Sequence, residues 1–285
     1  EQMQKNMRNW RKNAHPMGVL QAFVAALAGY YDEHGSEKEI SQQRAVNLIA
    51  KVPTIIASWD RVRNDKEVIQ PDPELSHAGN FLYMLTGNKP DKEMERVFDV
   101  CLILHADHTF NASTFAAREV ASTRAHMYSA VSAAVGALSG ELHGGANFEV
   151  MKMLLDIKDE KNAESWVKSK IENGDRIMGM GHAVYKTVDP RSMVLKELSK
   201  KLSVKTGLPW FEITKKVEEV TAGMMKNRKE KDIFPNVDLY SASVYHMLDI
   251  PMDLNTPIFA ISRVSGWTAH VIEEKFAEAA PKPML

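Results

Sequence analysis

Residues 16–31 read PMGVLQAFVAALAGYY, and this stretch gives the clearest indication of the fold class. Its apolar side chains recur every three or four positions, the spacing that buries one face of a helix; they are Val19, Leu20, Phe23, Val24, Leu27 and Tyr31. The same period recurs over 45–59, with an expected kink at Pro53, and over 94–104, 113–128, 150–157, 193–202, 211–225 and 258–276. The sequence has no run of alternating apolar and polar residues. It therefore predicts an all-α fold.

Composition sets broad limits on partners and location. The chain of 285 residues is 44% hydrophobic and 26% charged, which is ordinary for globular proteins. Lys and Arg number 36 against 37 Asp and Glu, a net charge of -1, so no bulk field attracts nucleic acid or an anionic membrane. The single cysteine, Cys101, cannot form an intrachain disulfide, and no apolar run approaches the roughly 18 residues of a membrane helix. We expect a soluble cytoplasmic protein without a nucleic-acid or membrane partner.

Reactive side chains gather in four segments: HADHTFNAST at 105–114, GELHGGAN at 140–147, GMGHAVYKTVDPR at 179–191 and FPNVD at 234–238. Glycines beside His143 and His182 let the backbone approach a ligand and offer its N–H groups. Asp189 and Pro190 are typical of a helix start. This predicts Arg191 in a first helical turn with its guanidinium free to meet an anion, although a surface arginine fits the same pattern.

Taken singly, these segments leave other interpretations open. The Gly-x-Gly at 179–181 is weak evidence for a dinucleotide site because the third glycine and the preceding strand are missing. His105, Asp107 and His108, together with His143 or His182, are loosely typical of metal ligands and leave a metal hydrolase open. The charge run KNRKEKD at 226–232 is typical of a solvated helix end.

Taken together, the segments resemble the citrate synthase family. The motifs GxLHGGAN, GMGHAVYKTVDPR and PNVDxYS occur in this order, with HADHxFNAST before them and Ser262-Arg263 after them, and the likeness begins at 13–17, NAHPM. The resemblance implies a two-domain helical transferase that closes over oxaloacetate and acetyl-CoA and makes citrate and CoA. It places a large domain at 1–147 and 242–285 and a small one at 148–241. It also implies a homodimer or a higher homo-oligomer, no metal, and acetyl-CoA as co-substrate without a permanently bound cofactor.

The resemblance assigns a role to each matching residue. Asp238 matches the general base that removes a proton from the acetyl methyl group, His143 the donor to the thioester oxygen, and His182 the group that polarises the oxaloacetate carbonyl. The residues that match ligands of oxaloacetate are His108, Arg191 and Arg263. Those that match contacts to the phosphates of CoA are Lys186, Lys229 and Lys231.

Elementary chemistry supports these roles. A carboxylate is a weak base toward carbon, so charge on the enolate oxygen needs a positioned donor such as His143. Forked arginine donors suit the two carboxylates of oxaloacetate better than lysines do. Both histidines should donate while neutral, so burial and nearby cations should hold the pKa values of His143 and His182 low. Glu141 would raise the pKa of His143 if it pointed inward, but surface exposure is the simpler expectation.

Several features leave alternatives open. The family pattern places an arginine in a C-terminal tail that crosses a dimer interface, whereas no arginine follows Arg263 in this sequence. A 2-methylcitrate synthase using propionyl-CoA would carry the same motifs. An inactive helical scaffold that only assembles with partners would do so too.

Overall fold

The computed structural model describes residues 2–31, 34–182, 184–229 and 232–276. Contacts between Cα atoms divide the chain into two compact units, which we call the first unit (Glu1–Gly144 and Thr256–Leu285) and the second unit (Gly145–Asn255). The second unit extends past the expected boundary at residue 241, so that the whole of the helix after Asn236 belongs to it. The expected domains at 1–147 with 242–285 and at 148–241 remain a prediction.

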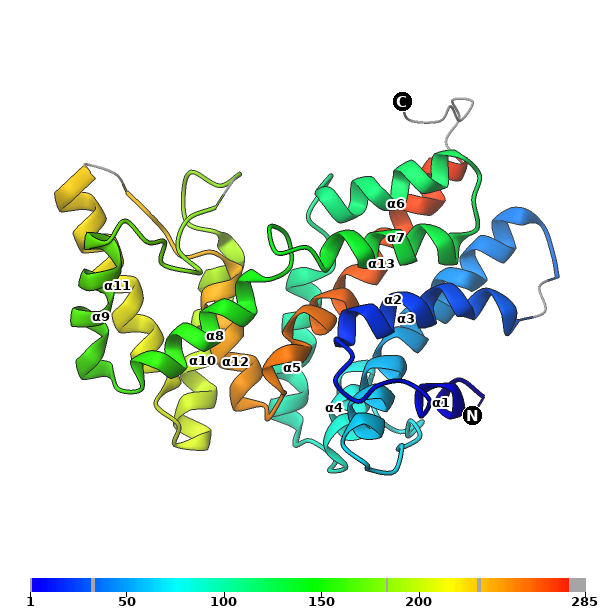
Figure 1. Cartoon of the computed structure of the whole chain (residues 1–285), viewed down its shortest axis with the longest axis horizontal. Helices are drawn as coiled ribbons and strands as arrows, with labels where there is room; N and C mark the ends of the chain where they lie inside the picture. The colour runs from blue at the N-terminus through cyan, green and yellow to red at the C-terminus, as the bar shows by residue number, and fades with distance from the viewer. Residues whose placement is uncertain (1, 32–33, 183, 230–231, 277–285) are drawn as a thin grey trace. The chain divides into compact units, whose positions relative to one another are not determined.

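Both units are built from helices, and the described residues contain no strand (Figure 1). The first unit holds α1 (Gln2–Met7), α2 (Pro16–Ala26), η1 (Leu27–Gly29), α3 (Glu37–Arg63), α4 (His77–Thr86), α5 (Lys92–His105), α6 (Ala112–Ser122), α7 (Met127–Leu138) and nearly all of α13 (Asn255–Phe276). The second unit holds α8 (Ala146–Ile157), α9 (Glu160–Glu172), α10 (Pro190–Thr206), α11 (Trp210–Lys229), α12 (Val237–Met247) and η2 (Met252–Leu254). The all-α prediction is therefore confirmed. No helix in the described ranges combines the length and apolarity that a membrane crossing requires.

Side-chain caps set where several of these helices begin. Ser36 and Glu39 form a reciprocal capping box at the start of α3. Asp189 caps α10 and Pro190 occupies its first turn, as predicted. Pro53 lies inside α3, and the helix continues beyond it to Arg63.

The core of the first unit centres on α7, which packs against α2 and α6. The α7 side chains that are buried are mostly small or aliphatic, which lets the neighbouring helices approach closely; they are Met127, Tyr128, Ala130, Val131, Ala134, Val135 and Leu138. The green and blue ribbons of α7 and α2 run together in Figure 1. This core fixes the end of α7, from which the loop carrying His143 leaves.

The expected helix over 113–128 was wrong, because the chain breaks into α6 and α7 between Ser122 and Met127. Arg124 has φ of 62° there, a left-handed conformation that ends a helix. The ring of His126 then caps the next helix by accepting a hydrogen bond from the Tyr128 N–H at 3.3 Å. The apolar period continues across the break, so a prediction from periodicity alone treats the two helices as one.

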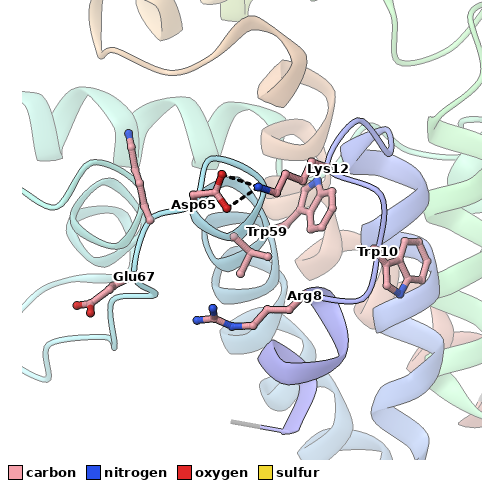
Figure 2. A pocket seen from close by; sticks show the side chains of 8 residues that line it. Arg8, Trp10, Lys12, Trp59, Asp65 and Glu67 are labelled. Carbon is pink, nitrogen blue, oxygen red and sulfur yellow. Dashed lines mark hydrogen bonds and ion pairs between the residues drawn. The ribbon is translucent and has the colours of Figure 1, made fainter.

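A cavity of about 300 Å³ lies in the first unit, where the residues after α1 face the C-terminal part of α3 (Figure 2). Arg8, Trp10, Lys12 and Trp59 are among the residues that line it. The Lys12 Nζ lies 2.5 Å from both carboxylate oxygens of Asp65, as the dashed lines in Figure 2 mark. The cavity therefore brings opposite charges together along its own lining.

Candidate active site

The predicted residues fall into two clusters, one in each unit. His108, His143 and Arg263 lie in the first unit, and His182, Lys186, Arg191 and Asp238 lie in the second. Lys231 and the side chain of Lys229 lie outside the described residues, so their expected contacts with CoA remain untested.

The loop before α8 holds His143. The N–H groups of His143 and Gly144 both donate to the Gly140 carbonyl, at 2.9 and 3.1 Å. A side chain at Gly144 would collide with the Leu138 carbonyl, so only glycine fits directly after the histidine. The Thr256 hydroxyl donates to the Gly144 carbonyl at 2.8 Å and ties this turn to α13. The imidazole is therefore presented from a fixed backbone.

Ser113 determines which ring nitrogen of His143 carries the proton. The Ser113 backbone N–H donates to Nε2 of His143 at 3.3 Å, and the Ser113 Oγ lies 2.9 Å from the same nitrogen. Because a backbone N–H can only donate, we assign Nε2 as an acceptor, which places the proton on Nδ1. Trp267 in turn donates its Nε1–H to Ser113 Oγ at 3.1 Å. His143 is thus a donor through Nδ1.

Burial lowers the pKa of His143, and the positive charge of Arg263 lowers it further. The expected depression of its pKa is therefore confirmed for the causes predicted. Glu141 is exposed and is not among the groups that shift this pKa, in line with the simpler expectation. A lowered pKa favours the neutral form of the ring.

Arg263 is 1% exposed on α13. Its Nε donates to the His105 carbonyl at 2.8 Å, and its guanidinium lies 4.7 Å from the centre of the Phe259 ring. His108 is half-buried in the loop after α5, and its carbonyl accepts a hydrogen bond from the Asn111 side chain at 3.3 Å. These contacts place a buried cation and an imidazole at the junction of α5, α6 and α13.

His105 has a structural role. Its Nδ1 lies 2.8 Å from the Cys101 carbonyl one turn earlier in α5, and its ring packs edge-on against Phe259. Among the described residues, no three His, Cys, Asp or Glu side chains gather closely enough to hold a metal ion. The ligand set of the metal-hydrolase alternative, in which His105 was a member, therefore does not assemble there.

In the second unit, backbone pairing joins the glycine-rich segment before His182 to the segment before Asp238. The Gly181 N–H donates to the Phe234 carbonyl at 2.7 Å, and the Asn236 N–H donates to the Gly179 carbonyl at 2.9 Å. An isolated antiparallel bridge joins Met180 to Pro235 between them. The segment just before His182 is thus paired with the segment just before Asp238.

Backbone N–H groups also fix the proton of His182. Its Nδ1 accepts hydrogen bonds from the N–H groups of Val184 at 3.0 Å and Tyr185 at 3.2 Å. The proton therefore lies on Nε2, which makes that nitrogen the donor. Burial lowers the pKa of His182, and the charge of Arg191 adds to this against the opposing charge of Asp189. This second expected depression is also confirmed.

Asp238 lies in the first turn of α12 and is half-buried. Its own N–H donates to the Asn236 Oδ1 at 2.9 Å, the cap that starts the helix. The Asn236 amide also donates to the Gly181 carbonyl at 2.8 Å. One side chain therefore fixes both the helix that carries Asp238 and the turn that carries His182.

Arg191 corrects one sequence expectation. Its guanidinium was expected to be free, but its Nε and Nη2 donate to the two oxygens of Asp189 at 3.0 and 2.8 Å. Burial of Asp189 raises the pKa of its carboxyl, but the hydrogen bonds and charge of Arg191 outweigh this and hold that pKa below its ordinary value. The acid at the helix cap binds the arginine two residues later, so the fork is oriented before any ligand arrives.

Lys186 is exposed and lines a cavity of about 260 Å³ within the second unit. Gly181, His182 and Phe234 line the same cavity. Lys186 therefore brings a positive charge to the lining of the cavity that His182 shares.

The site also contains residues that the sequence analysis did not single out. Ser113 stands in the quoted HADHxFNAST motif, so the motif carried a signal for it. Asn236 likewise stands in the quoted PNVDxYS motif, and it caps α12 by accepting the N–H of Asp238, two residues away. Trp267 acts through Ser113, 154 positions away, for which the sequence offers no spacing rule.

Comparison with known proteins identifies the family. The family model for the citrate synthase C-terminal domain matches residues 1–283. Citrate synthase from Synechocystis sp. is 46% identical over 270 residues, covering 94% of this chain and 67% of that protein. Citrate synthase 2 from Bacillus subtilis is 46% identical over 266 residues, covering 92% of this chain and 70% of that protein. A 2-methylcitrate synthase from Shewanella oneidensis is 41% identical over 264 residues, covering 92% of this chain and 68% of that protein.

Among solved structures, citrate synthase from Thermoplasma acidophilum, in a ternary complex with carboxymethyl coenzyme A and oxaloacetate, has a TM-score of 0.90 at 33% identity. The match covers 100% of this chain and 75% of that one. Fold and similarity together define an all-α transferase of the acyl-CoA:oxaloacetate C-acyltransferase type. The chain belongs to the citrate synthase family. The resemblance predicted from the motifs is thereby confirmed.

Proposed function

We propose that this chain condenses acetyl-CoA with oxaloacetate, with His143 and His182 as hydrogen-bond donors and Asp238 as general base. One observation carries the proposal. In each histidine, one ring nitrogen accepts a backbone N–H, so the other nitrogen is a fixed donor on a neutral ring. Two such donors suit a reaction in which negative charge develops first on a thioester oxygen and then on a ketone oxygen.

The first step is removal of a proton from the acetyl methyl group. Asp238 accepts this proton, and the electron pair of the C–H bond moves through the new C–C double bond onto the thioester oxygen. The Nδ1–H of His143 stabilises the oxygen as it gains charge. General-base catalysis by Asp238 contributes about 10² to 10⁴ in rate.

The second step forms the carbon–carbon bond. The terminal carbon of the enol attacks the ketone carbon of oxaloacetate, and the C=O electron pair moves to the ketone oxygen, which takes a proton through Nε2 of His182. Water then cleaves the thioester, releasing citrate and the CoA thiol.

Charge complementarity supports the assignment of the substrate ligands. Oxaloacetate carries two carboxylates, and burying them without partners would cost several kcal/mol each. Arg191 and Arg263 supply forked donors, and His108 supplies a further polar group. Lys186 faces the phosphates of CoA from the cavity beside His182, and Lys229 and Lys231 are proposed to do the same.

The proposal extends to the setting of the enzyme. No resident cofactor or metal enters the steps above, since acetyl-CoA is consumed as a co-substrate. We also propose that the enzyme is cytoplasmic and forms a homodimer or a higher homo-oligomer. Analytical ultracentrifugation of the 285-residue chain tests the oligomeric state.

The decisive experiment measures release of the CoA thiol by the 285-residue chain. We expect release from acetyl-CoA that depends on oxaloacetate and yields citrate. No oxaloacetate-dependent release from a folded sample would overturn the proposal and favour the inactive scaffold. Faster turnover with propionyl-CoA than with acetyl-CoA would instead support the 2-methylcitrate alternative, which the relative from Shewanella oneidensis keeps in view.

A further inference from the structure

One face of α13 contacts the loop that carries His108. Arg263, Gly266 and His270 are three or four residues apart, so they lie on successive turns of one helix face. Arg263 donates to the His105 carbonyl at 2.8 Å, and a side chain at Gly266 would collide with the Ala106 carbonyl. His270 reaches the next residue, with its Nε2 3.2 Å from the Asp107 Oδ1. This face of α13 thus contacts the three consecutive residues that precede His108.

Asp107 fixes the backbone on both sides of His108. Its Oδ1 is held by His270 on α13, while its Oδ2 accepts the Thr109 N–H at 3.1 Å. The carboxylate therefore bridges across His108, the residue between its own backbone and the bonded N–H. Thr109 has φ of 52°, a left-handed conformation that turns the chain sharply just after the histidine.

The opposite side of His270 is anchored as well. The Arg118 Nη1 lies 3.2 Å from Nδ1 of His270, and an arginine can only donate. Nδ1 is therefore an acceptor, and Nε2 carries the proton that it donates to Asp107. The Glu273 carboxylate lies 3.6 Å from Nδ1, too far for a hydrogen bond, and instead accepts from Arg118 at 2.5 Å.

We propose that Asp107 and His270 are positioning residues for oxaloacetate, acting through His108. The inference rests on the proposed function, in which His108 is a ligand of that substrate. Glu273 and Arg118 fix the tautomer of His270, His270 fixes the carboxylate of Asp107, and Asp107 fixes the direction in which the chain presents His108.

The exposure of these groups separates positioning from general stability. The side chain of Asp107 is 48% exposed and that of His270 is 21% exposed. A hydrogen bond at this exposure contributes little to folding. Its loss should change how His108 meets a ligand far more than it changes the unfolding equilibrium. A misplacement of about 1 Å at a substrate ligand lowers turnover at limiting substrate by up to about 10²-fold.

The experiment compares Asp107→Asn, His270→Leu and His270→Gln in the 285-residue chain. We expect the first two to raise the KM for oxaloacetate about tenfold and to leave the KM for acetyl-CoA within about twofold of wild type. Glutamine can place an N–H donor near the position of Nε2, so His270→Gln should recover most of the oxaloacetate affinity. Thermal unfolding should remain close to wild type in all three variants.

A matched control uses the same helix. Lys275 of α13 pairs with Glu37 at 3.1 Å, away from the His108 loop, so Glu37→Gln removes an α13 ion pair without touching the loop. This control should leave both KM values unchanged. Asp107→Asn and His270→Leu can also be combined in a double-mutant cycle. The double variant should have a KM for oxaloacetate no higher than that of the poorer single variant, because both substitutions remove the same interaction.

The outcomes distinguish the two claims. If wild type shows oxaloacetate-dependent thiol release but the variants keep its KM, or change both KM values equally, the positioning role is wrong and the proposed function stands. The positioning role is also overturned if His270→Gln is no better than His270→Leu. If wild type shows no such release, both claims fall together.

Discussion

Substituting Gly179 by alanine should damage the second cluster by displacing the start of α12. Gly179 has φ of 80°, where a non-glycine residue costs about 1 to 2 kcal/mol. A Cβ there would also lie 2.9 Å from Cα, Cβ and Cδ1 of Leu239, in the first turn of α12. Overpacking of this kind costs about 1 to 3 kcal/mol more. The total loss is therefore about 2 to 5 kcal/mol of unfolding free energy.

The collision between Leu239 and the Cβ that this substitution introduces at position 179 should also reduce turnover, because Leu239 follows Asp238 directly in the chain. Moving the base by about 1 Å relative to His182 should slow the reaction by about 10²-fold. Urea unfolding measures the stability change, and thiol release at saturating substrate measures the rate.

Gly174→Ala is the matched control for this change. Gly174 has φ of 81°, and a Cβ there would meet nothing within 4 Å. It therefore carries the backbone strain of about 1 to 2 kcal/mol without the collision, and its rate should match wild type. If Gly179→Ala were as stable and as active as Gly174→Ala, the claim that the paired loops place Asp238 beside His182 would be refuted.

Two further predictions concern charge. Arg191→Ala should lower the unfolding free energy by about 3 to 5 kcal/mol, because it leaves the carboxylate of Asp189 buried without its partner, and should weaken oxaloacetate binding; unfolding and calorimetry that match wild type would contradict this. The pKa values of His143 and His182 are lower in the folded chain than in the unfolded chain, so the unfolded chain binds more protons below about pH 6.5. The unfolding free energy should therefore fall as the pH drops from about 6.5 through the folded pKa values. The expected slope is up to about 1.4 kcal/mol per pH unit for each histidine. Urea midpoints at pH 7.5 and 5.5 test this, and a double variant with glutamine at both positions should show a smaller pH effect; an equal effect in wild type and variant would count against the depressed pKa values.

Much of the fold follows from apolar periodicity, and its failures have physical causes. The stripe over 16–31 became α2 and η1 because it buries a continuous face. By contrast, α9 buries only Ala163 and Val167, too few to produce a visible stripe. Its start is fixed instead by the Asp159 cap. Local capping and left-handed residues thus decide boundaries that periodicity cannot locate.

The candidate site divides in a similar way. The motifs named the histidines, arginines and acid, whose assembly into one site remains a prediction. The chemistry predicted the direction of both histidine pKa shifts, which is confirmed. The partners of His182 are the N–H groups of Val184 and Tyr185, within its own motif. The hydrogen bond from Trp267 to Ser113 was out of reach, because the two residues are separated by 154 positions and meet only in the folded first unit. The ion pair between Arg191 and Asp189 was missed although the two residues are close in sequence. An N-cap pattern predicts that one carboxylate oxygen of Asp189 accepts a backbone N–H, but it does not predict which group the other oxygen contacts.

The base assignment is tested most directly by Asp238→Asn, which removes the basic oxygen while keeping the size of the side chain. We predict that thiol release from acetyl-CoA and oxaloacetate falls by about 10² to 10⁴-fold, while calorimetry gives an oxaloacetate affinity close to that of wild type. A variant that turns over at the wild-type rate would show that residue 238 does not take the methyl proton, and the proposed mechanism would fail.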